Sequence, residues 1–96
     1  MSHKLQGENT DEFFRAILSL ESLEECYNFF EDLCTINEMK AMIQRYHVAI
    51  MLSEGKIYTD IVKETGASTA TISRVNRCLT YGSDGYKSVL EKREGK

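Results

Sequence analysis

Apolar residues recur at helical spacing along most of the chain, and the pattern predicts helices only. The first expected helix starts at Thr10, whose hydroxyl can cap it. The second follows Ser22, which forms a capping box with Glu25, and the third follows a second box made by Thr35 and Glu38. These start signals place three helices in the N-terminal half and predict an all-α fold.

The third expected helix is apolar on almost every side near its end. A stripe that includes Met39, Met42 and Ile50 is extended around the helix by Val48 and Met51. A helix that is apolar all round is buried, and a chain of 96 residues has little of its own to cover it. A second copy of the chain is therefore the expected cover, with a wide stripe in a monomeric bundle as the alternative.

Two short helices joined by a glycine-containing turn come next. The first is expected at Thr59–Thr65, and the second is capped by Ser68. Gly66 lies between them and suits the positive φ that such a turn requires. The residues expected to face inward are Ile61, Val62, Ile72, Val75 and Leu79. This arrangement predicts a helix-turn-helix unit.

The expected organisation is one domain with four segments. They are a flexible tail (1–9), a helical dimerisation core (10–54), the helix-turn-helix unit (55–80), and a short C-terminal helix and tail (81–96). Gly55 marks the first internal boundary, because glycine commonly ends a helix. The last helix, Tyr86 to Arg93, is polar and is expected to pack lightly or to fray.

The second helix of the helix-turn-helix unit carries short side chains on its outward side. The expected outward residues are Ser68, Thr69, Ala70, Ser73, Arg74 and Arg77, with Thr71 at the margin. Such a helix enters the major groove with its N-terminus first, and short side chains let its backbone approach the base edges. Threonine and alanine methyls can contact thymine methyls, and arginine can bind phosphate or guanine. DNA is the predicted partner, and a plain helical hairpin with a polar face is the alternative.

The charge distribution supports an anionic partner for the middle of the chain only. The net charge is −3. Residues 1–39 carry nine acids and two bases, whereas residues 40–79 carry three acids and six bases. The resulting balance of −7 against +3 is a modest signal for an anionic partner.

Other classes of function find little support. No apolar run is long enough for a membrane span and no signal peptide is visible, so the expected location is the cytoplasm. Cys26, Cys34 and Cys78 are expected to be buried thiols, and they and His47 lack the spacing of a zinc site. No nucleophile is paired with a base and no phosphate loop is present, so we expect neither an enzyme, a metal nor a cofactor.

The segment KETGASTATISRVNRCL closely resembles the recognition region of the Trp repressor, and the whole chain resembles the YerC/YecD branch of the Trp-repressor-like family. The likeness runs from about Asp11 to Leu79. It implies an intertwined, all-helical homodimer that regulates transcription from a two-fold symmetric operator. It also places Thr59 near the DNA phosphates or bases, and Lys63 near the DNA backbone, although a solvated charge explains Lys63 equally well.

In the prototype of this family tryptophan lies between two arginines, which correspond to Arg45 and Arg74. By the same resemblance, Thr35 is retained, a glycine that gives the indole room is replaced by Val75, and a serine is replaced by Cys78. These replacements make tryptophan an unsuitable effector, so a different small effector or none is expected. The alternative for Arg45 is an ion pair with an acid such as Glu38 or Asp32.

The sequence therefore predicts a DNA-binding transcriptional regulator that represses by occupying its operator. A protein-interaction module that keeps the fold without binding DNA is the main alternative. The acidic N-terminal part favours this alternative, and the stretch from Ser68 to Arg74 argues against it.

Overall fold

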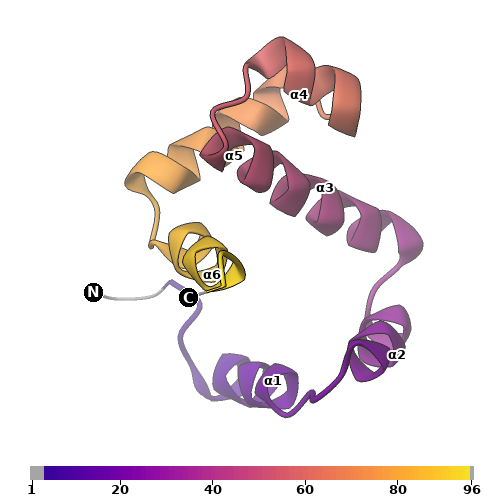
Figure 1. Ribbon diagram of the computed structural model, residues 1–96. Helices are drawn as coiled ribbons and strands as arrows, with labels where there is room; N and C mark the ends of the chain where they lie inside the picture. The colour runs from indigo at the N-terminus through magenta and orange to yellow at the C-terminus, as the bar shows by residue number, and fades with distance from the viewer. Residues whose placement is uncertain (1–3, 96) are drawn as a thin grey trace. The chain divides into compact units, whose positions relative to one another are not determined.

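The computed structural model describes residues 4–95, and the regular secondary structure in this part of the chain is α-helix throughout (Figure 1). The helices are α1 (Glu8–Leu18), α2 (Leu23–Leu33), α3 (Ile36–Ser53), α4 (Tyr58–Thr65), α5 (Thr69–Tyr81) and α6 (Gly85–Arg93). The chain divides into an N-terminal unit that ends at Ile36 and a C-terminal unit that starts at Asn37. The predicted all-α class is confirmed.

The N-terminal unit contains α1 and α2, and their starts differ in how well the sequence predicted them. The Ser22 hydroxyl accepts a hydrogen bond from the Glu25 backbone N–H at 3.1 Å, as the capping box predicts. The Glu25 carboxylate accepts from the N–H of Glu21 at 2.9 Å, one residue before the cap. The expected start of α1 at Thr10 is wrong, because the helix begins at Glu8 after Gly7, without a side-chain cap.

Neither helix of the N-terminal unit contains a buried residue. Its exposed large apolar side chains include Phe14, Leu18, Leu23, Tyr27 and Leu33. The expectation of buried cysteines is also wrong for a single chain, since Cys26 and Cys34 are half-buried and Cys78 is exposed.

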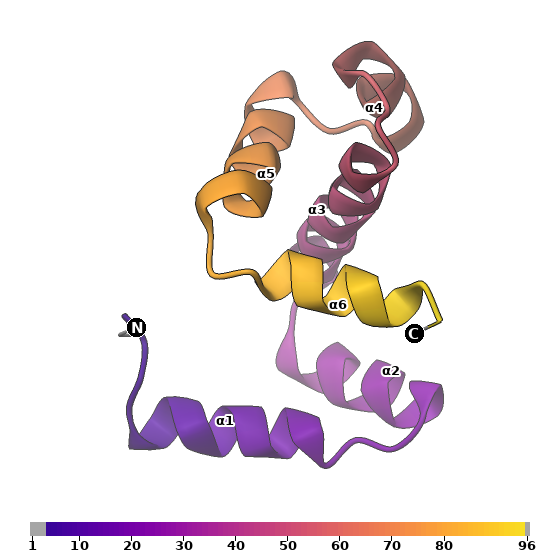
Figure 2. The ribbon, with the colours of Figure 1, turned by 60° about the vertical axis from the view of Figure 1, so that its left-hand side comes forward.

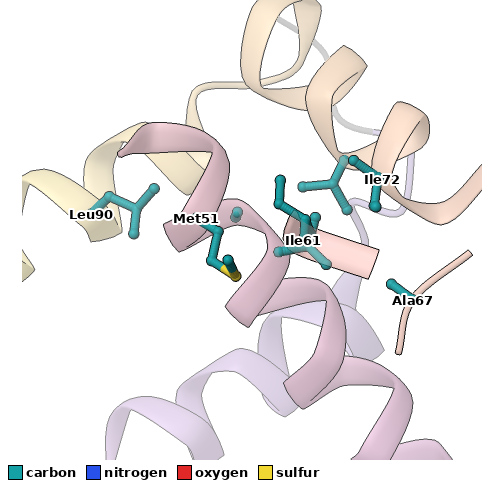
Figure 3. Packing of buried hydrophobic residues seen from close by; sticks show 8 residues of the cluster. Met51, Ile61, Ala67, Ile72 and Leu90 are labelled. Atoms are coloured by element: carbon teal, nitrogen blue, oxygen red, sulfur yellow. The ribbon is translucent and has the colours of Figure 1, made fainter. Parts of the chain in front are cut away.

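The C-terminal unit contains the hydrophobic core. The buried residues are Val48, Ala49, Met51, Ile61, Ala67, Ile72, Val75 and Leu90. Figure 3 shows Leu90 and Met51 toward one end of this cluster, Ile61 in the middle, and Ile72 and Ala67 at the other end. Residues from α3, α4, α5 and α6 thus share one core.

This core corrects the expected cover for the apolar end of α3. Val48 and Met51 are 0% and 4% exposed within one chain, because α4, α5 and α6 pack against them. A second copy is not needed to bury these two side chains. Leu90 is 7% exposed and is the one buried residue of α6, so this polar helix packs on the core through few side chains, in line with the expected light packing.

Glycines end the two helices that lead into the helix-turn-helix unit. After α3, the N–H of Gly55 donates to the carbonyl of Leu52, and the N–H of Lys56 donates to that of Met51. This pair of bonds is a Schellman motif, and Gly55 has the positive φ of 81° that the motif requires. Gly66 ends α4 in the same left-handed region, with φ 74°.

Candidate nucleic-acid interface

The helix-turn-helix unit is formed by α4, the turn at residues 66–68, and α5, whose connection Figure 2 shows. Ile61 is completely buried, whereas Val62 is 37% exposed, so the expectation that both face inward is wrong for Val62. On a helix of eight residues, adjacent positions point about 100° apart. One of the two therefore leaves the core face.

The turn between α4 and α5 is organised by Thr65. Its hydroxyl donates to the carbonyl oxygen of Ile61 at 2.7 Å and accepts from the N–H of Ala67 at 3.1 Å. Gly66 follows in the left-handed conformation, and the Ala67 side chain is 2% exposed within the core. A larger side chain at Ala67 would disturb that packing. The turn is therefore held both by the hydrogen bonds of Thr65 and by the buried side chain of Ala67.

Ser68 starts α5 as the sequence predicted. Its hydroxyl oxygen accepts from the N–H of Thr71 at 3.1 Å, and its hydroxyl group also lies 3.1 Å from the Thr71 hydroxyl and donates to it. Ser68 is exposed, yet its hydroxyl already serves the helix cap. The Ser68 hydroxyl therefore fixes the first turn of α5, and a contact between Ser68 and DNA remains a prediction.

Buried residues set the rotation of α5 about its axis. Ile72 and Val75 are 0% and 1% exposed, and Leu79 packs against the same cluster. We define the outer face of α5 as its exposed predicted DNA-binding residues, which are Thr69, Ala70, Ser73, Arg74 and Arg77. Thr71 is half-buried, at the margin, as expected. The structure thus places these side chains on one solvent-exposed face of α5. Their contact with DNA remains a prediction.

The outer face of α5 is electropositive. No acidic residue occurs between Thr69 and Tyr81. Within residues 4–95, neither Arg74 nor Arg77 takes part in an ion pair. Both guanidinium groups therefore remain available to an anion, and each presents several donors in a planar arrangement suited to phosphate.

The two predicted contacts on α4 are exposed, but they have different surroundings. Lys63 lines a hollow of about 250 Å³ together with Met51, Lys56, Asp60 and Glu64. No α5 residue lines this hollow, and two of its other lining residues, Asp60 and Glu64, are acidic. Thr59 is exposed on the same helix. As a candidate DNA-contacting surface, the outer face of α5 therefore has stronger structural support than Lys63.

The predicted effector residues are spread over both units. Thr35 lies in the N-terminal unit, whereas Arg45, Arg74, Val75 and Cys78 lie in the C-terminal unit. Arg45 is half-buried, and the Val75 side chain belongs to the hydrophobic core.

Cys78 alone of these residues lines a hollow of about 570 Å³. Its other lining residues are Tyr46, Gly82, Ser83, Gly85, Tyr86 and Val89. This hollow therefore does not correspond to the predicted effector pocket, which remains a hypothesis.

Sequence reasoning missed two polar contacts between α3 and the end of α4. The Gln44 side-chain amide donates to the backbone carbonyl of Thr65 at 3.1 Å. One turn further along α3, His47 Nε2 lies 3.9 Å from a carboxylate oxygen of Glu64. Contacts between residues so far apart in the chain leave no local signature, so the pattern of the sequence could not reveal them.

The part of the chain that the structure describes contains no helix with the length and hydropathy needed to span a bilayer. Among the same residues, no three or more His, Cys, Asp and Glu side chains gather where they could hold a metal ion.

An all-helical chain with an exposed, positively charged helix-turn-helix unit defines a class of DNA-binding regulators. The family model described as Trp repressor protein matches residues 8–94. The chain belongs to the Trp repressor family, in its YerC branch. This membership indicates a DNA-binding regulator.

Similar proteins support this assignment. The uncharacterized protein YerC of Bacillus subtilis (strain 168) is 60% identical over 89 residues, which are 93% of this chain and 86% of that protein. A putative Trp repressor from Staphylococcus aureus superposes with a TM-score of 0.92 at 53% identity, covering 95% of this chain and 91% of the other. A TrpR-like protein from Eubacterium eligens ATCC 27750 gives 0.92 at 56% identity, covering 95% and 94%.

Proposed function

We propose that this chain is a sequence-specific regulator of transcription that acts as a homodimer and represses by occupying a two-fold symmetric operator. The observation that carries the proposal is the outer face of α5. There, short side chains share one exposed surface with two arginines that form no ion pair within residues 4–95. Family membership gives the same direction.

The outer face suits the major groove by size and by chemistry. Thr69 and Ala70 lie in the first turn of α5, the end that enters the groove first, and their methyl groups can contact thymine. Arg74 lies one turn further along and Arg77 nearly another turn beyond it. They can bind a guanine edge or phosphates on the walls of the groove.

The homodimer rests on the N-terminal unit. Neither α1 nor α2 has a buried residue, and large apolar side chains lie exposed in this unit. Leu18, Leu23 and Tyr27 are 82%, 80% and 67% exposed. Burying a side chain such as that of Leu18 or Leu23 stabilises an assembly by about 1.5–3 kcal/mol, and contiguous exposed apolar faces mark interaction sites. A second copy supplies a matching apolar face, because it presents the same residues.

A two-fold dimer would place one α5 helix in each half of its operator. The two half-sites are then expected about one helical turn of DNA apart, or a multiple of it, and related by dyad symmetry. Occupying such a site next to a promoter blocks polymerase without any activation domain. Steric repression is therefore the mechanism that we propose.

The alternative is a module that binds protein and not DNA. Residues 1–36 carry eight acids and two bases, which disfavour an approach to phosphates by this part of the chain. This alternative would leave unexplained why Arg74 and Arg77 are exposed on α5 and form no ion pair in the described part of the chain.

The test that separates the two functions is selection of bound duplexes from a random pool, followed by a salt titration of the selected sequence. We expect a dyad-symmetric consensus, and an affinity that falls with salt by a log–log slope of about −0.9 for each neutralised phosphate. Failure to retain any duplex at low salt would exclude the regulator and leave the interaction module.

A further inference from the structure

We propose that Gln44 of α3 is a positioning residue that holds the turn of the helix-turn-helix unit, and with it the start of α5, in the orientation that reads DNA. This inference rests on the function proposed above. It concerns a side chain that lies outside the predicted DNA-contacting set. Its part in that function would be exerted entirely through Thr65.

The contact joins two helices close to the turn. Gln44 Nε2 donates to the carbonyl oxygen of Thr65 at 3.1 Å across 21 positions of sequence, and both residues are half-buried. Thr65 is the last residue of α4, and the carbonyls in the last turn of a helix lack intrahelical partners. Gln44 therefore supplies a donor that α4 cannot supply itself.

Thr65 passes this restraint on to the turn. Its hydroxyl accepts from the N–H of Ala67 at 3.1 Å while donating to Ile61 at 2.7 Å, which fixes Thr65 against both α4 and the turn. Ser68 follows Ala67 directly and caps α5 through the N–H of Thr71. Three short hydrogen-bonded steps thus connect a side chain of α3 to the first turn of α5.

The hydrophobic core alone leaves this orientation less well determined. Ile61, Ala67 and Ile72 hold the two helices together by packing that is not directional. A hydrogen bond is directional, and recognition requires side chains to be held within about 0.5 Å of the productive geometry. The nearby His47–Glu64 pair is 3.9 Å long and largely exposed, so it contributes little to the restraint.

The test replaces Gln44 by methionine, which keeps the length of the side chain and removes the amide. Asn37→Leu is the matched control, because it removes an exposed amide from α3 about two helical turns before Gln44. Two quantities are measured for both variants. They are the hydrogen exchange of the Ala67 amide in the full chain, and the affinities for the selected duplex and for a random duplex.

For Gln44→Met we expect faster exchange at Ala67 with unchanged helicity. We also expect about a tenfold weaker affinity for the selected duplex, the size of effect that one net hydrogen bond can have. Affinity for random DNA should change less than twofold, because the charges that bind phosphates are intact. Asn37→Leu should match the original chain in all of these measurements.

Equal losses on selected and random DNA would contradict a positioning role and indicate general destabilisation. Unchanged exchange at Ala67 would show that Gln44 does not restrain the turn, and unchanged affinity would show that the restraint is irrelevant to reading. If the original chain binds no duplex at all, the proposed function fails. Exchange at Ala67 then still decides whether Gln44 holds the turn.

Discussion

The hydroxyl oxygen of Ser68 accepts a hydrogen bond from the backbone N–H of Thr71 at 3.1 Å, and this contact starts α5. It satisfies one of the N–H groups that the first turn of a helix leaves without a partner. Because the outer face of α5 begins at the next residue, the same bond that stabilises the helix also orders the proposed DNA-reading end.

Replacing Ser68 by alanine should remove this cap. We expect a loss of about 1 kcal/mol in the free energy of unfolding, the usual cost of deleting a serine cap. Urea unfolding followed by circular dichroism measures it, at one fixed protein concentration because assembly affects apparent stability. Ser73→Ala is the control, since Ser73 is exposed within α5 and alanine is the better helix former. An equal loss in both variants would show that Ser68 is not the cap.

Gly66→Ala tests the turn. Gly66 has φ 74°, and a Cβ placed there would meet no atom within 4 Å, so the cost is conformational and not steric crowding by neighbours. A non-glycine residue in the left-handed region costs about 1–2 kcal/mol. Gly85→Ala is the control, because its Cβ is equally free and its φ is not positive. The measurement is the thermal unfolding temperature of each variant. If Gly66→Ala unfolds at the same temperature as Gly85→Ala and the original chain, the turn does not require glycine at this position.

The homodimer is tested on α1. Leu18 is 82% exposed in one chain, so a lysine there costs the single chain little but would place a charge in the proposed interface. Sedimentation equilibrium should give twice the 11.0 kDa of one chain for the original protein and a lower mass for Leu18→Lys. Glu12→Lys adds a lysine to a different face of the same helix and should remain dimeric. A monomeric original chain at micromolar concentration would refute the homodimer.

Tryptophan should not act as the effector. By resemblance to the family prototype, Val75 stands where a glycine gives the indole room, and Cys78 replaces a serine with a weaker hydrogen-bonding group. The Val75 side chain is 1% exposed within the core, so it has little freedom to move aside. Calorimetric titration with tryptophan, with and without the selected duplex, is expected to show no tight binding. Tight binding in either titration would overturn this prediction.

The sequence predicted those features of the fold that have local signatures. The caps at Ser22 and Ser68 and the left-handed Gly66 follow from side-chain chemistry within a few residues, and all three are confirmed. The start of α1 was misplaced because Gly7 provides no side-chain cap that a pattern could reveal. The inward position of Val62 was wrong because a short helix buries only one narrow face.

Long-range packing explains the remaining differences. The apolar residues on every side of α3 near Val48 and Met51 indicate that this part of the helix is buried, but they do not indicate by which segment. In the structure, Val48 and Met51 share a core with residues of α4, α5 and α6. The bond from Gln44 to Thr65 joins residues 21 positions apart and has no counterpart in any local pattern. In the candidate site, exposure of the outer face of α5 was predictable because buried Ile72 and Val75 set the rotation of the helix.

The central claim is that the outer face of α5 reads DNA, and fluorescence anisotropy with the selected duplex tests it most directly. Arg74→Ala should weaken binding by about 1–3 kcal/mol, the range for one base-contacting arginine. Thr69→Glu should weaken it by placing a carboxylate against the duplex, while leaving helicity intact because an acid suits the first turn of a helix. Arg93→Ala on α6 is the matched arginine control. Unchanged affinity in both Arg74→Ala and Thr69→Glu would contradict the account.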